Sequence, residues 1–256
     1  MLFKVIVLAF LLTIPLHAQV PDNSLGLVAM YHMNELKGSR VYDSSPYRND
    51  ATFDNAPVWV LGVEGYCLQM NGSNTSITAV TQTWISFATN NRLTFSLWVF
   101  PYTVATTQGL FHKSVGFATF EYECELKTDS TIAFTALDNG GSFVVYCNTT
   151  LKAVKNRWNH IIVAMDSSSK DKFMMVNGVL EPSPGGGGGG SPQNGGGSLS
   201  IGKCWHGNNM SGLIDEFAVF NRFLTDGEAK NIYYEGLGVH RIIGLLNLWN
   251  RLYQYL

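Results

Sequence analysis

Three glutamates at two-residue spacing form the clearest acidic pattern in the chain. Glu121, Glu123 and Glu125 lie in one short segment that reads as a β-strand. Successive strand residues point to opposite faces, so all three carboxylates would share one face. Retaining hydrolysis of a glycosidic bond needs two carboxyls about 5 Å apart, and residues two or four apart on a strand lie near or above that range. The alternative is a solvated face of mutually repelling charges.

A second set of residues offers oxygen ligands. Asp43, Asn49 and Asp50 fall in one predicted loop, and Asp215 lies in a late predicted strand next to Glu216. Calcium takes six to eight oxygens from carboxylates, amides and backbone carbonyls, so these four are candidate calcium ligands. The alternative is that Asp43 shapes a turn. The pair Asp215 and Glu216 adds no catalytic dyad, because adjacent strand residues should point to opposite faces.

The N-terminal residues have the composition of a secretory signal peptide, which we assign to residues 1–18. Lys4 precedes an apolar run, and Ala18 is a suitable cleavage position before Gln19. The run is shorter than the ~20 apolar residues of a spanning helix. We therefore expect an exported chain, either secreted or at the cell surface. The alternative is an uncleaved N-terminal anchor.

Export would place the four cysteines in an oxidising compartment, where two disulfides are expected. If the segments around Cys124, Ile132 and Val145 form a meander, the first and third strands lie roughly 9 to 10 Å apart. That separation exceeds the ~7 Å Cα limit of a disulfide, so a bond between Cys124 and Cys147 is disfavoured. The connectivity otherwise stays open. The cysteines are Cys67, Cys124, Cys147 and Cys204.

One short segment combines two kinds of metal ligand. In an extended segment, Cys204 and His206 place a thiol and an imidazole on one face. Both are zinc ligands, but the sequence has no C-x-x-C or H-x-x-x-H motif to complete a site. Zinc is therefore an alternative to a disulfide for Cys204.

Short predicted strands with turn signals between them would position these residues. Residues 131–137 and 142–147 are separated by an Asp-Asn-Gly-Gly turn, and Asn177-Gly178 is typical of a two-residue hairpin. This spacing indicates an antiparallel sandwich.

Two apolar strands should supply much of the core. They cover residues 95–100 and 160–165, and we expect Trp98 and Trp158 to make the largest contributions. Since His160 lies in the second of these strands, we interpret it as a structural histidine.

The closing segment over residues 211–224 carries apolar side chains on both faces, which is typical of a central strand. Thr225 and Glu228 then have the spacing of a helix capping box, and Gly236 is a natural stop signal.

Taken in order, these segments resemble the laminin-G-like, concanavalin A-like sandwich domains of secreted and surface proteins. The resemblance covers about residues 25–237. It implies an all-β, two-sheet antiparallel jelly-roll sandwich with a short C-terminal helix, and binding of carbohydrate or protein at a rim or on the concave face. The glutamate strand also resembles the Glu-x-Asp-x-Glu strand of laminarinase-type glycoside hydrolases, with Glu123 in place of the aspartate. The segments that carry the first resemblance are 27–35, 42–45, 68–73, 95–101, 158–163, 176–179 and 212–233.

We divide the chain into a signal peptide (1–18), a sandwich domain (19–237) and an amphipathic helix (238–256). A glycine-rich insert over residues 181–198 should be mobile and lie outside the fold. In the final segment, apolar residues recur at three- and four-residue steps. This helix would pack on the sandwich, dock on a partner or a second copy, or lie on a membrane surface.

The overall composition limits the function further. The chain has 256 residues, 46% of them hydrophobic, and a net charge of −2. That is enough apolar material for one sizeable core, and no basic field favours nucleic acid. We expect a secreted, non-catalytic recognition or adhesion module for carbohydrate or extracellular protein. The alternatives are a structural subunit of a surface or particle assembly docked through its C-terminal helix, and a glycoside hydrolase using Glu121, Glu123 and Glu125.

Overall fold

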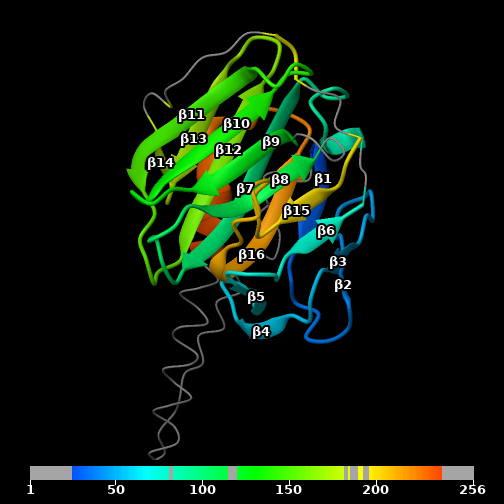
Figure 1. Ribbon diagram of the computed structural model, residues 1–256, viewed down its shortest axis with the longest axis vertical. Helices are drawn as coiled ribbons and strands as arrows, with labels where there is room; N and C mark the ends of the chain where they lie inside the picture. The colour runs from blue at the N-terminus through cyan, green and yellow to red at the C-terminus, as the bar shows by residue number, and fades with distance from the viewer. Residues whose placement is uncertain are drawn as a thin grey trace, which may run out of the picture.

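Two antiparallel eight-stranded sheets pack face to face in the computed structural model of this chain (Figure 1). The structure describes residues 25–80, 83–114, 120–181, 184, 190–192 and 196–237. The predicted all-β jelly-roll sandwich is confirmed. The predicted signal peptide and the predicted helix over residues 238–256 lie outside the described residues.

We call the two layers sheet I and sheet II. Sheet I contains, in spatial order, β14 (Val179–Leu180), β13 (Lys172–Val176), β12 (Asn159–Asp166), β7 (Arg92–Pro101), β16 (Ser211–Phe220), β5 (Tyr66–Asn71) and β4 (Val58–Leu61), with β1 (Leu27–Tyr31) also paired to β16. Sheet II contains β11 (Phe143–Lys152), β10 (Thr131–Leu137), β9 (Phe120–Leu126), β8 (Gln108–Ser114), β15 (Leu199–Ile201), β6 (Ile77–Ala79), β3 (Ala51–Phe53) and β2 (Arg40–Val41). A 3₁₀ turn, η1 (Thr83–Ile85), connects β6 to β7.

The closing segment forms the centre of sheet I, as predicted. β16 pairs with β7, β5 and β1, so its neighbours cover both of its edges. Its inward side chains join a core between the sheets that centres on the aromatic rings of Phe95, Phe111, Tyr122 and Phe134. The alternating pattern of the strands therefore produces one continuous apolar interior.

The two tryptophans expected in that core lie elsewhere. Trp98 is buried, but it points away from sheet II and stacks on Tyr233 of the C-terminal helix at a ring separation of 5.8 Å. Trp158 precedes β12 and is only partly buried. His160 is fully buried beside Trp98, and its Nε2 lies 2.8 Å from the Ser96 hydroxyl, in keeping with a structural role.

The predicted capping box begins the helix that covers residues 226–237. The Thr225 N–H donates to the Glu228 carboxylate at 2.8 Å, and the Glu228 N–H donates back to the Thr225 hydroxyl at 3.3 Å. Gly236 does not end the helix as expected. A Cβ there would overlap the Trp98 ring, so this glycine allows the helix to lie close against sheet I. Among the described residues, no helix is long and apolar enough to span a membrane.

The described parts of the glycine-rich insert contact the sandwich, contrary to the expectation that it lies outside the fold. Glu181 is buried and accepts hydrogen bonds from the Thr150 and Leu151 N–H groups. The Gly197 carbonyl accepts a 2.6 Å bond from the ammonium of buried Lys113. This ammonium needs an acceptor, and the close approach of the insert supplies one.

Candidate functional site

Two adjoining cavities form a cleft on the outer side of sheet I. The first, of about 370 Å³, has mostly apolar walls from β1, β7, β16 and the helix over 226–237. The second, of about 760 Å³, is more polar and is lined by residues that follow β1 together with Tyr42. Both are lined by His32, Ser44 and Glu64, and we call the combined hollow the His32 cleft.

A histidine and a glutamate meet where the two cavities join. His32 Nδ1 lies 2.8 Å from Glu216 Oε2. The His32 side chain is 41% exposed, whereas that of Glu216 is 12% exposed. The glutamate therefore sits at the base of the cleft and the imidazole at its wall.

A bulge in β16 directs Glu216 toward His32. The register of β16 against β7 shifts between Asp215 and Ala218, and Glu216 has a φ of 50°. This conformation is strained for a residue with a side chain, and such strain often occurs at functional sites. The strict alternation that we expected for Asp215 and Glu216 is therefore interrupted where the cleft begins.

Asp215 holds the turn that carries Glu64, one of the residues that line the cleft. Its buried carboxylate accepts bonds from the Val63 N–H at 2.7 Å and the Glu64 N–H at 3.3 Å. These bonds hold the turn between β4 and β5, and so they fix Glu64 at the wall of the cleft.

The carboxylates of the cleft have unused hydrogen-bonding capacity. Glu216 Oε1 and Glu35 Oε2 are buried atoms without a hydrogen-bond partner among the described residues. Burial raises the pKa of Glu216, although the bond from His32 opposes this shift. The same bond raises the pKa of His32, against the effect of its burial. Buried polar atoms are normally satisfied, so this site is suited to a ligand that donates hydrogen bonds.

The three candidate catalytic glutamates of β9 do not form an open acidic face. Glu121 is fully buried and accepts a bond from the Ser86 hydroxyl at 2.9 Å and another from the Phe87 N–H. Glu123 is buried, and its carboxylate accepts a hydrogen bond from the Trp205 N–H. The Glu125 carboxylate forms an ion pair with the Lys127 ammonium at 3.0 Å. Each carboxylate thus faces a different protein partner. Burial raises the pKa of Glu121 to about 7 and also raises that of Glu123.

The nominated calcium ligands do not gather as one set. Asp43 accepts four bonds, from the N–H groups of Met30, Ser45 and Asn49 and from the Ser45 hydroxyl. Asp50 accepts a bond from the Asp43 N–H at 3.1 Å. Among the described residues, Asp43, Asp50 and Asp215 do not form a group with carboxylate oxygens within 4.8 Å of one another. Asp43 therefore shapes its loop, and calcium binding by this set stays a prediction.

The structure contains neither of the two expected disulfides. All four cysteines are buried free thiols. Cys67 lies on β5 in sheet I, whereas Cys124 and Cys147 lie on β9 and β11 in sheet II. The last two stand on opposite sides of Phe134 of β10, so they are two strand spacings apart. The predicted meander, which disfavours a bond between Cys124 and Cys147, is confirmed.

The residues of the cleft escaped the sequence-based search for chemistry. His32, Glu64 and Glu216 are not close to one another in sequence, and Glu216 faces His32 only because of the bulge in β16. A signal existed, since His32 and Glu216 both fall in the segments that carry the family resemblance. Antiparallel pairing of β1 with β16 places Tyr31 opposite Phe217, and therefore His32 near Glu216.

Comparison with known proteins agrees with the observed fold. The sequence profile of the concanavalin A-like lectin/glucanases superfamily matches residues 71–230, which is more than half of the chain. The chain belongs to this superfamily. No curated protein sequence matches it significantly.

Several solved structures share the sandwich. Domain 4 of AbnA, an extracellular arabinanase from Geobacillus stearothermophilus solved with arabinotriose, matches with a TM-score of 0.62 and 18% identity over 81% of this chain and 98% of that domain. The binding domain of botulinum neurotoxin serotype G matches with a TM-score of 0.63 and 15% identity, covering 81% of this chain and 50% of that one. Trypanosoma rangeli sialidase matches with a TM-score of 0.59 and 16% identity, covering 81% of this chain and 32% of the sialidase.

These identities show a shared fold and nothing finer. This member of the superfamily spans nearly all of the arabinanase domain, half of the toxin domain and about a third of the sialidase. Its sandwich therefore occurs both in binding domains and in the chains of glycosidases.

Proposed function

We propose that this protein is an exported, non-catalytic recognition module that binds carbohydrate in the His32 cleft. The observation that carries the proposal is the buried Glu216 Oε1, which has no partner among the described residues and lies at the base of a partly apolar cavity. Sugar hydroxyls donate hydrogen bonds, and a carboxylate accepts the strong, charge-assisted kind.

The walls of the cleft suit the two-sided chemistry of a sugar ring. Carbohydrates present hydroxyls at their edges and C–H groups on their faces, and ligand cavities combine apolar walls with a few placed polar groups. Glu216, Glu35 and His32 supply the polar groups. The ring of Tyr42, which is 59% exposed at the second cavity, supplies a surface for C–H contacts. The known arabinotriose complex of a domain with this fold supports the assignment of ligand class.

The hydrogen bonds that Glu121 and Glu123 make within the protein support a non-catalytic role. Glycoside hydrolysis uses two carboxyls on either side of the scissile bond. Glu121 and Glu123 are engaged by neighbouring backbone and hydroxyl groups. A sugar could lie between them only if those buried bonds were broken.

The test is retention of the protein on an immobilised panel of polysaccharides and glycans, with released reducing ends measured in the same wells. We expect retention on at least one glycan without release. Glu216→Gln should weaken that binding by roughly 10- to 100-fold, since a hydrogen bond to a charged group contributes about 1.5 to 3 kcal/mol. Asp129→Asn, in the exposed turn between β9 and β10, is the matched control and should bind like the wild type.

Three outcomes would contradict the proposal. Absence of binding across the panel would rule out carbohydrate as the ligand class tested. Equal binding by wild type and Glu216→Gln would place the site outside the His32 cleft. Release of reducing ends that is lost in Glu121→Gln or Glu125→Gln would establish the hydrolase alternative.

A further inference from the structure

A second cluster of functional groups lies on the outer side of sheet II. Glu123, Glu125, Cys204 and His206 each contribute one ligand atom, and these four atoms all lie within 4.8 Å of one another. Within the described part of the chain, it is the one group of three or more His, Cys, Asp and Glu side chains that meets this criterion. We propose that these four residues bind a zinc ion.

The cluster exists because the loop between β15 and β16 crosses the face of sheet II. Gly109 of β8 lies opposite Glu125 of β9, and a Cβ at Gly109 would overlap the backbone of Cys204. The Gly109 N–H donates to the Asn208 carbonyl at 2.9 Å. The absence of a side chain at this one position thus lets the loop rest directly on the sheet, with Cys204 beside the glutamates of β9.

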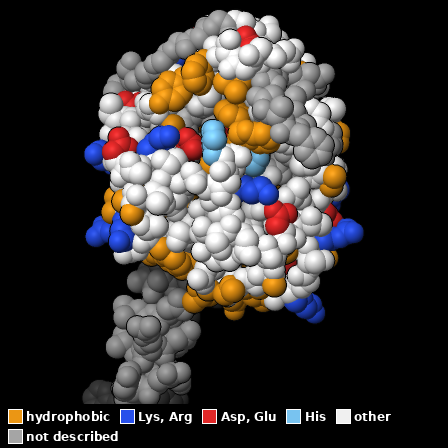
Figure 2. Space-filling model, viewed as in Figure 1, with side chains coloured by type: hydrophobic (Ala, Val, Ile, Leu, Met, Phe, Trp, Pro, Cys, Tyr) orange, Lys and Arg blue, Asp and Glu red, His pale blue; other side chains and the backbone are white. Residues whose placement is uncertain are grey.

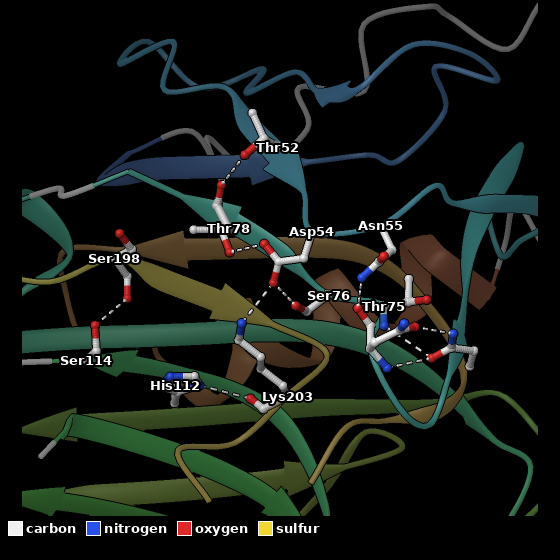
Figure 3. Close-up of polar contacts among 12 residues, drawn as sticks. Thr52, Asp54, Asn55, Thr75, Ser76, Thr78, His112, Ser114, Ser198 and Lys203 are labelled. Atoms are coloured by element: carbon white, nitrogen blue, oxygen red, sulfur yellow. Dashed lines mark hydrogen bonds and ion pairs between the residues drawn. The ribbon is translucent and has the colours of Figure 1, made fainter. Parts of the chain in front are cut away.

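Lys203 holds the beginning of this loop in place. Its ammonium donates to Asp54 Oδ2 at 2.8 Å, and its carbonyl accepts a 3.1 Å bond from His112 Nδ1 (Figure 3). Histidine, acidic and basic side chains lie close together near the middle of the face shown in Figure 2. The bonds of Lys203 and the close approach at Gly109 therefore fix the backbone at Cys204 without a bound metal.

The distances within the cluster suit a shared cation better than direct bonds. The Trp205 N–H donates a hydrogen bond to Glu123 Oε2, and the other carboxylate oxygen, Oε1, lies 4.0 Å from His206 Nδ1. This is too long for a hydrogen bond, and it is somewhat longer than the roughly 3.4 Å that separates two ligand atoms of a tetrahedral ion with bonds of about 2.0 to 2.2 Å. His206 is 69% exposed and precedes Gly207, so its imidazole can adjust its position at little expense.

The ligand types favour zinc over calcium or magnesium. A thiolate and an imidazole are ligands of borderline and soft metals, and zinc accepts carboxylates together with them. Two glutamates and one thiolate would carry three negative charges, whereas Lys127, paired with Glu125, supplies one positive charge. A divalent cation would balance the remainder. The competing interpretation is structural: Glu123 only fixes Trp205, and Glu125 only pairs with Lys127.

Cobalt titration of the purified protein distinguishes the two interpretations. A Co²⁺ ion that is bound by a thiolate gives a near-ultraviolet charge-transfer absorption. We expect this band to saturate at one equivalent and to disappear when Zn²⁺ is added. Cys204→Ser should lose the band, whereas Cys147→Ser, which removes a buried thiol on the core side of the same sheet, should keep it.

His206→Ala provides a test that does not require the substitution of a buried residue. Because its side chain is exposed, the variant should fold with an unchanged circular dichroism spectrum while its zinc affinity falls at least 10-fold. Zinc should raise the thermal midpoint of the wild type and leave that of His206→Ala nearly unchanged. No cobalt band in the wild type, a band that persists in Cys204→Ser, or equal zinc affinity in His206→Ala would each overturn the proposal.

Discussion

Replacing Phe95 with alanine is expected to lower the free energy of unfolding by about 4 kcal/mol, the usual result for a buried phenylalanine. Phe95 is fully buried on β7, and its ring centroid lies 4.7 Å from that of Phe111 and 4.9 Å from that of Tyr122. These contacts join sheet I to sheet II at the centre of the sandwich. Removing the ring both loses apolar burial and leaves a cavity that its stiff aromatic neighbours cannot fill.

Urea denaturation measures this effect directly. Phe143→Ala is the matched control, because that side chain is 55% exposed at the start of β11 and its loss should change the unfolding free energy by less than about 0.5 kcal/mol. A loss below about 1 kcal/mol for Phe95→Ala would mean that the aromatic cluster does not hold the two sheets together.

Glu121→Gln is expected to change how stability depends on pH. Burial raises the pKa of Glu121 from 4.5 to about 7, while Lys113 and the hydrogen bonds from Ser86 and Phe87 oppose the shift. The unfolded chain loses the proton near pH 4.5, whereas the folded chain holds it to about pH 7. The wild type therefore loses stability as the pH rises through this window, by about 3 kcal/mol between pH 4 and 8.

Glutamine cannot ionise, so the variant should lack this loss. The difference in unfolding free energy between the variant and the wild type should move by about 3 kcal/mol in favour of the variant from pH 4 to pH 8. Any constant effect of the substitution, such as a weaker bond to Ser86, cancels in this comparison. Urea denaturation at several pH values gives the profile, and a difference that does not vary with pH would contradict the buried, raised-pKa environment of Glu121.

The fold was largely predictable because its signals are local. Residues 131–137 were predicted as a strand and form β10 with the same bounds. The spacing of Thr225 and Glu228 likewise identified the start of the helix. Alternation, turn residues and capping are properties of short segments, so they can be recognised without knowledge of the tertiary structure.

The sites were less predictable because they depend on contacts between distant segments. An even number of cysteines says nothing about which sulfur atoms meet, and here Cys124 and Cys147 are held apart by β10. The pairing of His32 with Glu216 requires a bulge and a positive φ at a non-glycine residue, which no local pattern indicates. Asp43 was a correct choice as a loop residue, since it accepts three bonds from Ser45 and Asn49 of its own loop and one from Met30 of β1, whereas calcium binding stays a prediction.

The residues of the metal-ligand cluster were identified from the sequence, but their proximity to one another was not. The sequence pointed separately to the β9 glutamates and to the pair of Cys204 and His206, without a reason to combine them. The loop that crosses sheet II at Gly109 brings the two sets together. A glycine that allows two backbones to touch is not distinguishable in sequence from one in an ordinary turn.

The most direct test of the proposed function is to observe the His32 cleft during glycan binding. The chain has eight methionines, of which Met30 lines the first cavity, whereas Met165 and Met174 are fully buried in the core. With ¹³C-methyl methionine labelling and the Met30 signal assigned from a Met30→Leu variant, we predict that a retained glycan shifts the Met30 methyl resonance and leaves those of Met165 and Met174 in place. A glycan that binds to saturation without moving the Met30 resonance would contradict the assignment of this cleft as the carbohydrate site.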